Sequence, residues 1–217
     1  MRLAVIIAGF RPEGVLQTVK DLDNQTYKDF DVILVNDNSE GLREIMFDIC
    51  KDRPNYHWID VGSRLGYYGA FSRNMGVMAS FNYLPERVKK NDSDFWVTFH
   101  DDDNLWLPNH IEEFVKSHKE KPEATMIGCD IEMRSKINPD YSHNLNNQLA
   151  GQNTDLGAWF YKKELFEEYG YFPASLRFKI SYDWELIKKF SENEGDSKIV
   201  VNHYRPCSFI FFSKKRK

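Results

Sequence analysis

Apolar residues follow two alternating rhythms over the first half of the chain. Short runs of β-branched and large apolar residues, which are typical of buried strands, cover residues 3–8, 31–35, 57–61 and 95–99. Between these runs, apolar residues recur at helical spacing over residues 15–22, 42–50 and 70–81. Strands that alternate with helices are joined by right-handed crossovers. The pattern therefore predicts an α/β fold with an open, mainly parallel twisted sheet that helices flank on both faces.

The second half follows these rhythms less regularly. Helices are predicted over residues 109–119 and 163–169 and from Tyr182 onward, and strands over residues 125–129 and 199–201. Further apolar runs lie at residues 158–161 and 209–212. Residues 135–155 are rich in Asn and Gln and poor in apolar side chains, so we expect a long loop there. No repeat or linker divides the chain. We predict a single domain over residues 1–212, followed by a basic tail at residues 213–217.

Composition narrows the class of protein. The chain has 217 residues, of which 41% are hydrophobic, and 29 Lys and Arg against 33 Asp and Glu give a net charge of −4. A chain of this length can bury an adequate core without disulfides or a structural metal. Charges of both signs are interspersed, whereas binding to nucleic acid needs a basic stripe. We therefore expect an ordinary globular protein whose partners are not nucleic acids.

Location in the cell can be predicted only indirectly. The longest apolar run, Leu3–Phe10, is too short to cross a bilayer, and Met1-Arg2 is too short for the charged region of a signal peptide. The three cysteines are far apart and show no metal-binding spacing, which fits a reducing compartment. We predict a cytoplasmic protein. The basic run Lys214–Lys217 could make weak peripheral contact with an anionic membrane, or it could be a solvated terminus.

The strongest chemical signal is the run His100-Asp101-Asp102-Asp103-Asn104 at the end of a predicted strand. Ligands of open α/β sheets bind at the carboxyl ends of the strands. If the backbone stays extended, Asp101 and Asp103 point to one side and Asp102 to the other. Such carboxylates suit Mg²⁺ or Mn²⁺, which take one or two of them and leave positions for substrate phosphates. The alternative is a turn that caps the following helix, although three consecutive acids exceed what a cap needs.

A second acid, Asp37, follows the second predicted strand within Asn36-Asp37-Asn38-Ser39. A carboxylate at that position can accept hydrogen bonds from a nucleobase edge or from a ribose hydroxyl. The same residues also satisfy the requirements of an Asx-turn or a helix cap. From the residues alone, the two interpretations are equally supported.

Several segments, in order and at about the right spacing, resemble the motifs of family-two glycosyltransferases with the GT-A fold, a Rossmann-like fold. The segments are Val5–Arg11, Gln25–Ser39, Ser72–Gly76, Asp101–Asp103, Gly157–Phe172 and Tyr182–Leu186. The resemblance implies that residues 1–104 bind a nucleotide sugar and that residues 105–212 bind the acceptor. It implies an inverting transferase that uses Mn²⁺ or Mg²⁺ and a nucleotide-diphosphate sugar, with UDP as the expected nucleotide.

The resemblance also assigns residues to the donor. Phe10 and Arg11 would flank the nucleobase, Asp37 would lie near the uracil or ribose, and Arg73 would lie on the donor side. Asp101 and Asp103 would form the Asp-x-Asp metal motif. Asp102 would also contact the donor, and Asp103 would be the direct metal ligand. A late histidine, His203, could complete the metal site or could be a structural residue.

On the acceptor side, the resemblance makes Asp183 the general base. Inverting transfer needs a base that removes the proton of the acceptor hydroxyl and a cation that neutralises the departing diphosphate, with no covalent intermediate. An acid at the start of a helix is kept ionised by the helix terminus, but it could also be purely structural. Trp159 and Trp184 could stack on sugar rings or belong to the core.

The acceptor could be a glycan, a lipid or a protein. Because the chain ends soon after Phe212 without the membrane helices of processive relatives, we expect transfer of a single sugar. Two alternatives remain open. A nucleotidyltransferase would need a Gly-rich basic phosphate loop, of which Gly9–Gly14 is a poor version. A non-catalytic sugar-binding or nucleotide-binding protein could retain the same fold.

Overall fold

A computed structural model describes residues 1–37, 41–62, 69–82, 94–135, 142–145, 154–173, 182–202 and 209–213. Its helices are α1 (Pro12–Asp23), α2 (Leu42–Cys50), α3 (Ala70–Asn82), α4 (His110–Glu120), α5 (Lys163–Tyr169) and α6 (Tyr182–Glu194). Its strands are β1 (Arg2–Gly9), β2 (Asp31–Asn36), β3 (Tyr56–Asp60), β4 (Phe95–Phe99), β5 (Asn104–Trp106), β6 (Met126–Cys129), β7 (Ile131–Ser135), β8 (Ser142–Leu145), β9 (Trp159–Lys162), β10 (Ile199–Asn202) and β11 (Phe209–Ser213).

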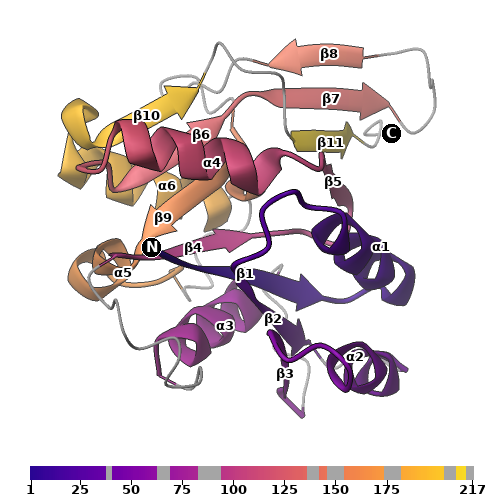
Figure 1. Cartoon of the computed structure of the whole chain (residues 1–217). Helices are drawn as coiled ribbons and strands as arrows, with labels where there is room; N and C mark the ends of the chain where they lie inside the picture. Colours follow the sequence, from indigo (N-terminus) through magenta and orange to yellow (C-terminus); the bar gives the residue numbers. More distant parts are fainter. Residues whose placement is uncertain are drawn as a thin grey trace.

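The larger sheet confirms the predicted open α/β architecture. Its seven strands lie in the order β10-β6-β9-β4-β1-β2-β3 (Figure 1). Strands β4, β1, β2 and β3 are mutually parallel, as β10 and β6 are, whereas β9 runs antiparallel to both of its neighbours. The carboxyl ends of β1, β2 and β4 therefore meet at one edge, where Phe10, Asp37 and the acidic run follow them.

Helices cover both faces of the larger sheet, as the sequence predicts. On one face, Gly9 of β1 lies against Val15 of α1 and against Leu42 and Met46 of α2. On the other face, Gly76 of α3 lies against Ile6 of β1 and Val35 of β2 so closely that a Cβ atom at residue 76 would collide with Ile6. Residues 6 and 9 project from opposite faces of the strand, because side chains alternate. Gly76 thereby sets how near α3 lies to the sheet.

A second sheet was not predicted. Its four strands lie in the order β5-β11-β7-β8, and three of them were missed, because β5, β7 and β8 are short or polar. Strand β8 lies inside residues 135–155, so the expectation of a continuous loop there was wrong. Residues 214–217 of the predicted basic tail lie outside the described residues, and Ser213 ends β11.

The core lies between the larger sheet and its helices. Strand β4 is buried along its whole length, and the ring of Phe99 contacts Tyr161, Phe166 and Phe172 at centroid separations of 5.8, 6.5 and 5.3 Å. Edge-to-face contacts of this kind add to the stability gained by burial. The strand that carries the acidic run is thus fixed on both sides. No helix within the described ranges has the length and apolarity needed to cross a membrane.

Candidate active site

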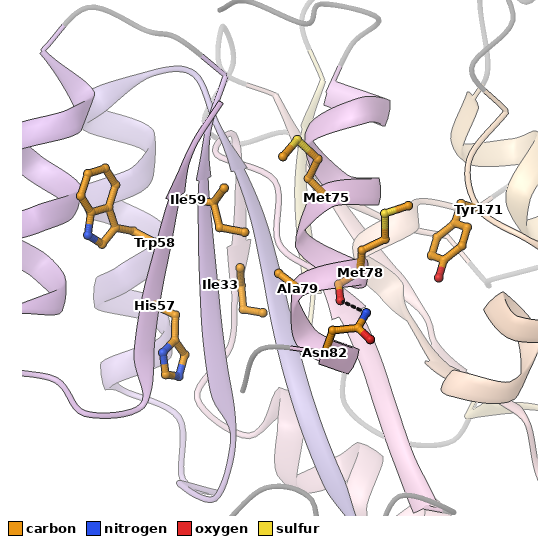
Figure 2. A pocket seen from close by; sticks show the side chains of 9 residues that line it. All are labelled: Ile33, His57, Trp58, Ile59, Met75, Met78, Ala79, Asn82 and Tyr171. Atoms are coloured by element: carbon orange, nitrogen blue, oxygen red, sulfur yellow. Dashed lines mark hydrogen bonds between the residues drawn. The ribbon is translucent and has the colours of Figure 1, made fainter. Parts of the chain in front are cut away.

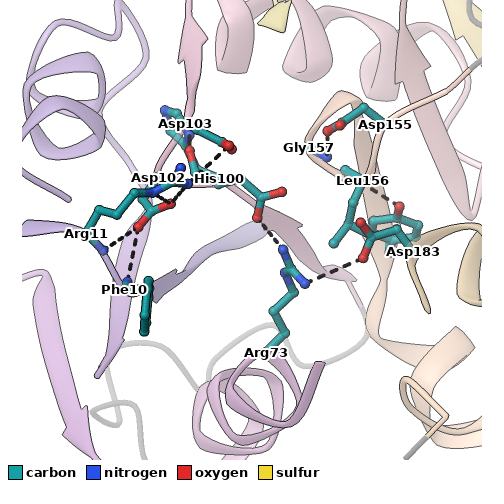
Figure 3. Close-up of polar contacts among 12 residues, drawn as sticks. Phe10, Arg11, Arg73, His100, Asp102, Asp103, Asp155, Leu156, Gly157 and Asp183 are labelled. Carbon is teal, nitrogen blue, oxygen red and sulfur yellow. Dashed lines mark hydrogen bonds and ion pairs between the residues drawn. The ribbon is translucent and has the colours of Figure 1, made fainter. Parts of the chain in front are cut away.

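The acidic run after β4 is a turn rather than an extension of the strand. The backbone N–H of Asn104 donates to the carbonyl of Asp101 at 3.2 Å, which closes the turn. The expected alternation of side chains was therefore wrong, because it required an extended backbone. Asp102 and Asp103 both approach Arg11 (Figure 3), whereas Asp101 approaches Arg73. The turn divides the three acids between two arginines.

Asp102 holds the loop between β1 and α1. Its Oδ2 accepts hydrogen bonds from the backbone N–H groups of Phe10 and Arg11, at 3.1 and 2.7 Å, and its Oδ1 accepts from Nε of Arg11 at 2.9 Å. Arg11 is the N-cap residue of α1, and its own side chain does not cap the helix. A carboxylate beside a helix N-terminus is stabilised by the helix dipole and by the N–H groups there. In turn, hydrogen bonding of the Arg11 guanidinium to the carboxylate of Asp102 raises the pKa of Arg11 above its ordinary value.

Arg73 joins the acidic turn to the predicted base. Its side chain is 9% exposed, and its guanidinium donates to Oδ1 of Asp101 at 2.5 Å and approaches Oδ1 of Asp183 at 3.5 Å. Burial alone would lower the pKa of Arg73, but the carboxylates of Asp101 and Asp183 hold it above the ordinary value. The arginine therefore stays charged. It thereby contacts residues 101 and 183, which come from the two predicted halves, and Figure 3 shows its guanidinium directed toward Asp183.

The next residue of α3, Asn74, binds the backbone of Phe172. The amide group of Asn74 donates to the carbonyl of Phe172 at 3.1 Å and accepts from the N–H of the same residue at 3.0 Å. The ring of Phe172 also lies 5.9 Å from the guanidinium of Arg73. One motif segment thus makes three kinds of contact. Arg73 contacts two acids, Asn74 contacts the backbone of Phe172, and Gly76 contacts the sheet.

Asp183 lies in the first turn of α6, and its side chain is 43% exposed. Removal of surrounding water raises its pKa, Arg73 opposes this rise, and the negative charge of Asp101 adds to it. The start of α6 also favours the ionised form. A carboxylate that is accessible but has a raised affinity for protons has the properties of a general base.

Asp155 is a further acid of this site that sequence reasoning missed. It precedes a short 3₁₀ helix, Leu156–Ala158, and its Oδ1 accepts a hydrogen bond from the N–H of Gly157 at 3.0 Å. Burial raises the pKa of Asp155 to about 8, with contributions from the charges of Asp101 and Asp183, whereas Gly157 and Arg73 oppose the rise. In the sequence, the only signal was an acid before an apolar run, which also marks an ordinary cap.

The remaining donor-side residues lie at the same edge of the sheet. Phe10 follows β1 and is 44% exposed. Asp37 follows β2 and is buried, and its backbone N–H donates to the carbonyl of Gly9 at 3.3 Å, which ties the ends of the two strands together. This arrangement agrees with the predicted positions of Phe10 and Asp37, while their contacts with a nucleotide stay predictions.

The predicted aromatic platforms differ in exposure. Trp159 is fully buried, with its ring against Gly128 and its indole N–H donating to the hydroxyl of Thr154. Trp184 is partly buried at the edge of the core, next to Asp183 on α6. Of these two tryptophans, only Trp184 keeps some exposed surface, and its contact with a sugar stays a prediction. His203 lies outside the described residues, so its predicted part in a metal site stays a prediction.

A large apolar pocket lies elsewhere, between α3 and the strands β2 and β3 (Figure 2). Its volume is about 700 Å³, and its lining includes Trp58, Met75, Met78 and Tyr171. It contains none of the acids described above. The chemistry of the acidic turn, rather than the size of this pocket, therefore identifies the candidate active site.

The acidic turn fits a divalent cation that substrate phosphates also bind. Within the described ranges, no three His, Cys, Asp or Glu side chains gather in a geometry that would hold a metal by themselves. Mg²⁺ and Mn²⁺ in nucleotide sites need only one or two protein carboxylates. Asp103 can supply such an oxygen donor, because its side chain is 33% exposed although it pairs with Arg11 at 3.1 Å. Asp101 belongs to the same turn and is the second candidate.

Comparisons with solved structures agree with the fold. Residues 1–349 of TarS from S. aureus, in complex with UDP-GlcNAc, match with a TM-score of 0.73 and 16% identity over 100% of this chain and 60% of that one. The mannosyltransferase PcManGT from Pyrobaculum calidifontis, in complex with GDP-Man and Mn²⁺, matches with a TM-score of 0.64 and 14% identity over 99% and 58% of the two chains. The present chain thus spans about 60% of the length of these neighbours.

At this level of identity, the structural neighbours establish the fold alone. No curated protein matches the sequence. The family is established by a different comparison, in which the model of "Glycosyl transferase family 2" matches residues 4–180. That span includes the ends of β1, β2 and β4, the acidic turn, Arg73 and Asp155. Because the match covers most of the sequence, the chain belongs to glycosyl transferase family 2.

Proposed function

We propose that this chain transfers a single sugar from a nucleotide-diphosphate donor, a UDP-sugar in the first instance, to an acceptor hydroxyl with inversion at the anomeric carbon. One observation carries the proposal. Arg73 brings Asp101 of the acidic turn and Asp183 of the predicted acceptor side to the same guanidinium. A leaving-group side and a base side, which inverting transfer requires together, are thereby adjacent.

Asp183 removes the proton of the acceptor hydroxyl as that oxygen bonds to the anomeric carbon and the bond to the diphosphate breaks. Its exposure leaves room for the acceptor, and its raised pKa gives it affinity for the proton. Asp103 and Asp101 would hold Mn²⁺ or Mg²⁺, and the bound cation would neutralise charge on the departing diphosphate. Arg73 fixes the positions of Asp101 and Asp183 relative to each other. Phe10, Arg11 and Asp37 bind the nucleoside.

The neighbours support the choice of donor class. One TarS structure contains UDP and another UDP-GlcNAc, and the PcManGT structure contains GDP-Man and Mn²⁺. These ligands support a nucleoside-diphosphate sugar as the donor, with uridine as the first base to test. The acceptor, which could be a glycan, a lipid or a protein, is left open by this proposal.

Calorimetric titration of UDP, GDP, CDP and TDP tests the proposal directly. The titrations are made with Mn²⁺ and then with EDTA, on the wild type, on Asp103→Ala and on the matched variant Asp196→Ala, whose acid lies exposed before β10. We expect one diphosphate to bind only with Mn²⁺, and to bind to Asp196→Ala but not to Asp103→Ala. Binding that ignores both Mn²⁺ and Asp103 would contradict the metal-dependent mechanism.

A further inference from the structure

Asp155 occupies a distinctive place in the site. It enters from the segment before β9, whereas Asp101 follows β4 and Asp183 begins α6. The charge of Arg73 acts on all three of these acids, so Asp155 lies in the same electrostatic environment as the acidic turn and the base (Figure 3). Its cap position accounts for the hydrogen bond to Gly157. The proposed reaction, however, gives no role to a third acid near Asp101 and Asp183.

We propose that Asp155 binds a hydroxyl group of the donor sugar and thereby takes part in selecting that sugar. The inference rests on the proposed function. It adds a sugar-recognising residue to a site whose other residues bind the diphosphate, hold the nucleoside or remove a proton.

The location of the sugar ring leads to this assignment. In an inverting displacement the attacking oxygen, the anomeric carbon and the departing oxygen are in line. The sugar therefore lies between the acidic turn, which holds the diphosphate, and Asp183, which faces the acceptor. Figure 3 shows Asp155 and Asp183 on one side of Arg73, with Asp102 and Asp103 of the acidic turn on the other, so the carboxyl group of Asp155 borders this same space.

The hydrogen bonding of Asp155 leaves one oxygen for a ligand. Its Oδ1 accepts from the N–H of Gly157, and within the described ranges Oδ2 accepts no hydrogen bond. The second oxygen of a carboxyl group can accept a hydrogen bond from a sugar hydroxyl or, when it carries the proton, donate one to it. The hydrogen bond at Oδ1 fixes the orientation of the carboxyl group, and this orientation also sets the direction of Oδ2.

Capping of the 3₁₀ helix is the competing explanation, and substitutions separate the two roles. Serine caps a helix about as well as aspartate, so Asp155→Ser keeps an acceptor for Gly157 but lacks the second oxygen. Asp155→Asn keeps both reach and capping. A structural role predicts normal behaviour for Asp155→Ser, whereas a sugar-binding role predicts that Asp155→Ser behaves like Asp155→Ala.

The test compares the affinity for each sugar nucleotide with that for its own diphosphate. UDP, UDP-Glc, UDP-Gal, UDP-GlcNAc, GDP and GDP-Man are titrated with Mn²⁺ into the wild type and the three Asp155 variants, and thermal unfolding checks each fold. For the sugar nucleotide that the wild type binds best, we expect Asp155→Ser and Asp155→Ala to lose roughly tenfold in affinity. Affinity for the diphosphate alone should stay within about twofold.

The outcomes distinguish this inference from the proposed function. If the wild type binds none of the diphosphates, the proposed function fails, and the inference fails with it. If the diphosphate binds but Asp155→Ser retains wild-type affinity for every sugar nucleotide, only the inference is overturned. Equal losses for diphosphate and sugar nucleotide would also overturn it, since they would show a general disturbance of the site.

Discussion

Two arginines contact the acidic turn, and they differ in depth and reach. Arg73 is buried and contacts Asp101 and Asp183, which lie on opposite sides of the proposed reaction. Arg11 is 33% exposed and contacts Asp102 and Asp103, next to its own loop. The charge of Arg73 therefore connects two parts of a reaction centre, whereas that of Arg11 mainly fixes the β1–α1 loop. Similar ion pairs in one site can thus have different consequences when they are removed.

The largest effect is expected at Asp183, an acid that contacts Arg73 but not Arg11. Asp183→Asn keeps the shape of the side chain but removes its capacity to take up a proton. We expect a rate loss of about a thousandfold, within the usual range for a general base, and unchanged affinity for the nucleoside diphosphate. The release of UDP from UDP-GlcNAc, followed with time, measures the first quantity and calorimetry the second. Full activity in this variant would remove Asp183 from the mechanism.

Replacing each arginine by methionine compares the two groups in stability. Arg73→Met leaves Asp101 and Asp183 without their shared cation, and we expect the free energy of unfolding to fall by about 3 kcal/mol. Arg11→Met should cost about 1 kcal/mol, because the pair is partly exposed and Asp102 keeps its two backbone hydrogen bonds. Urea denaturation measures both values. Equal losses would show that the difference in burial has no energetic consequence.

Acid sensitivity is expected to arise in the core rather than in either arginine group. Burial lowers the pKa of His110 to about 3, with a smaller effect of His100, from an ordinary value of 6.5. Between those values the unfolded chain binds more protons than the folded one, so stability falls as the pH decreases below 6.5. Down to pH 5 the loss from this residue is about 2 kcal/mol.

The difference between wild type and His110→Phe isolates that contribution, because the carboxylates are common to both proteins. Phenylalanine can keep the ring contacts that His110 makes with Trp106 and Phe160 at 4.4 and 5.1 Å. In urea denaturation at pH 7, 6 and 5, the stability of the wild type should fall relative to that of the variant, by about 2 kcal/mol in total. Parallel pH profiles would assign the acid sensitivity to the carboxylates instead.

The smallest effect concerns Asp102 within the acidic turn. Asp102→Asn retains an oxygen for the N–H groups of Phe10 and Arg11 but loses its charge beside Arg11. We expect a stability loss of about 1 kcal/mol and retention of Mn²⁺-dependent binding of the diphosphate. Asp103→Asn, its neighbour, should lose that binding. If both variants lose it equally, Asp102 belongs to the donor site, as the resemblance implied.

The sequence predicted the larger sheet well because its elements have strong periodicity. Strands β1, β2 and β4 are continuous apolar runs, and the helices between them repeat at helical spacing. Strands β5, β7 and β8 were missed, because a short or polar strand is recognised by its pairing partner rather than by its own pattern. For example, β5 pairs with β11, which lies about a hundred residues further along the chain.

The site was predictable in its residue types but less so in its contacts. Asp101, Asp103, Arg73 and Asp183 were identified through motifs, yet the meeting of Arg73 with Asp183 joins positions 110 residues apart. Local spacing contains no information on such a contact. Because the chain turns after β4, Asp103 lies with Asp102 and not, as expected, with Asp101. Asp155 was missed because a helix cap and a ligand-binding acid have the same local sequence.

Gly76 has a consequence for which sequences can evolve under this fold. Any side chain at this position would move α3 away from Ile6, and Arg73 lies less than one turn earlier on the same helix. Variation at a position that never meets a substrate would therefore displace the guanidinium that joins Asp101 to Asp183. Substitutions at residue 76 are therefore limited by the position that Arg73 must keep between Asp101 and Asp183, and not only by the space available in the core.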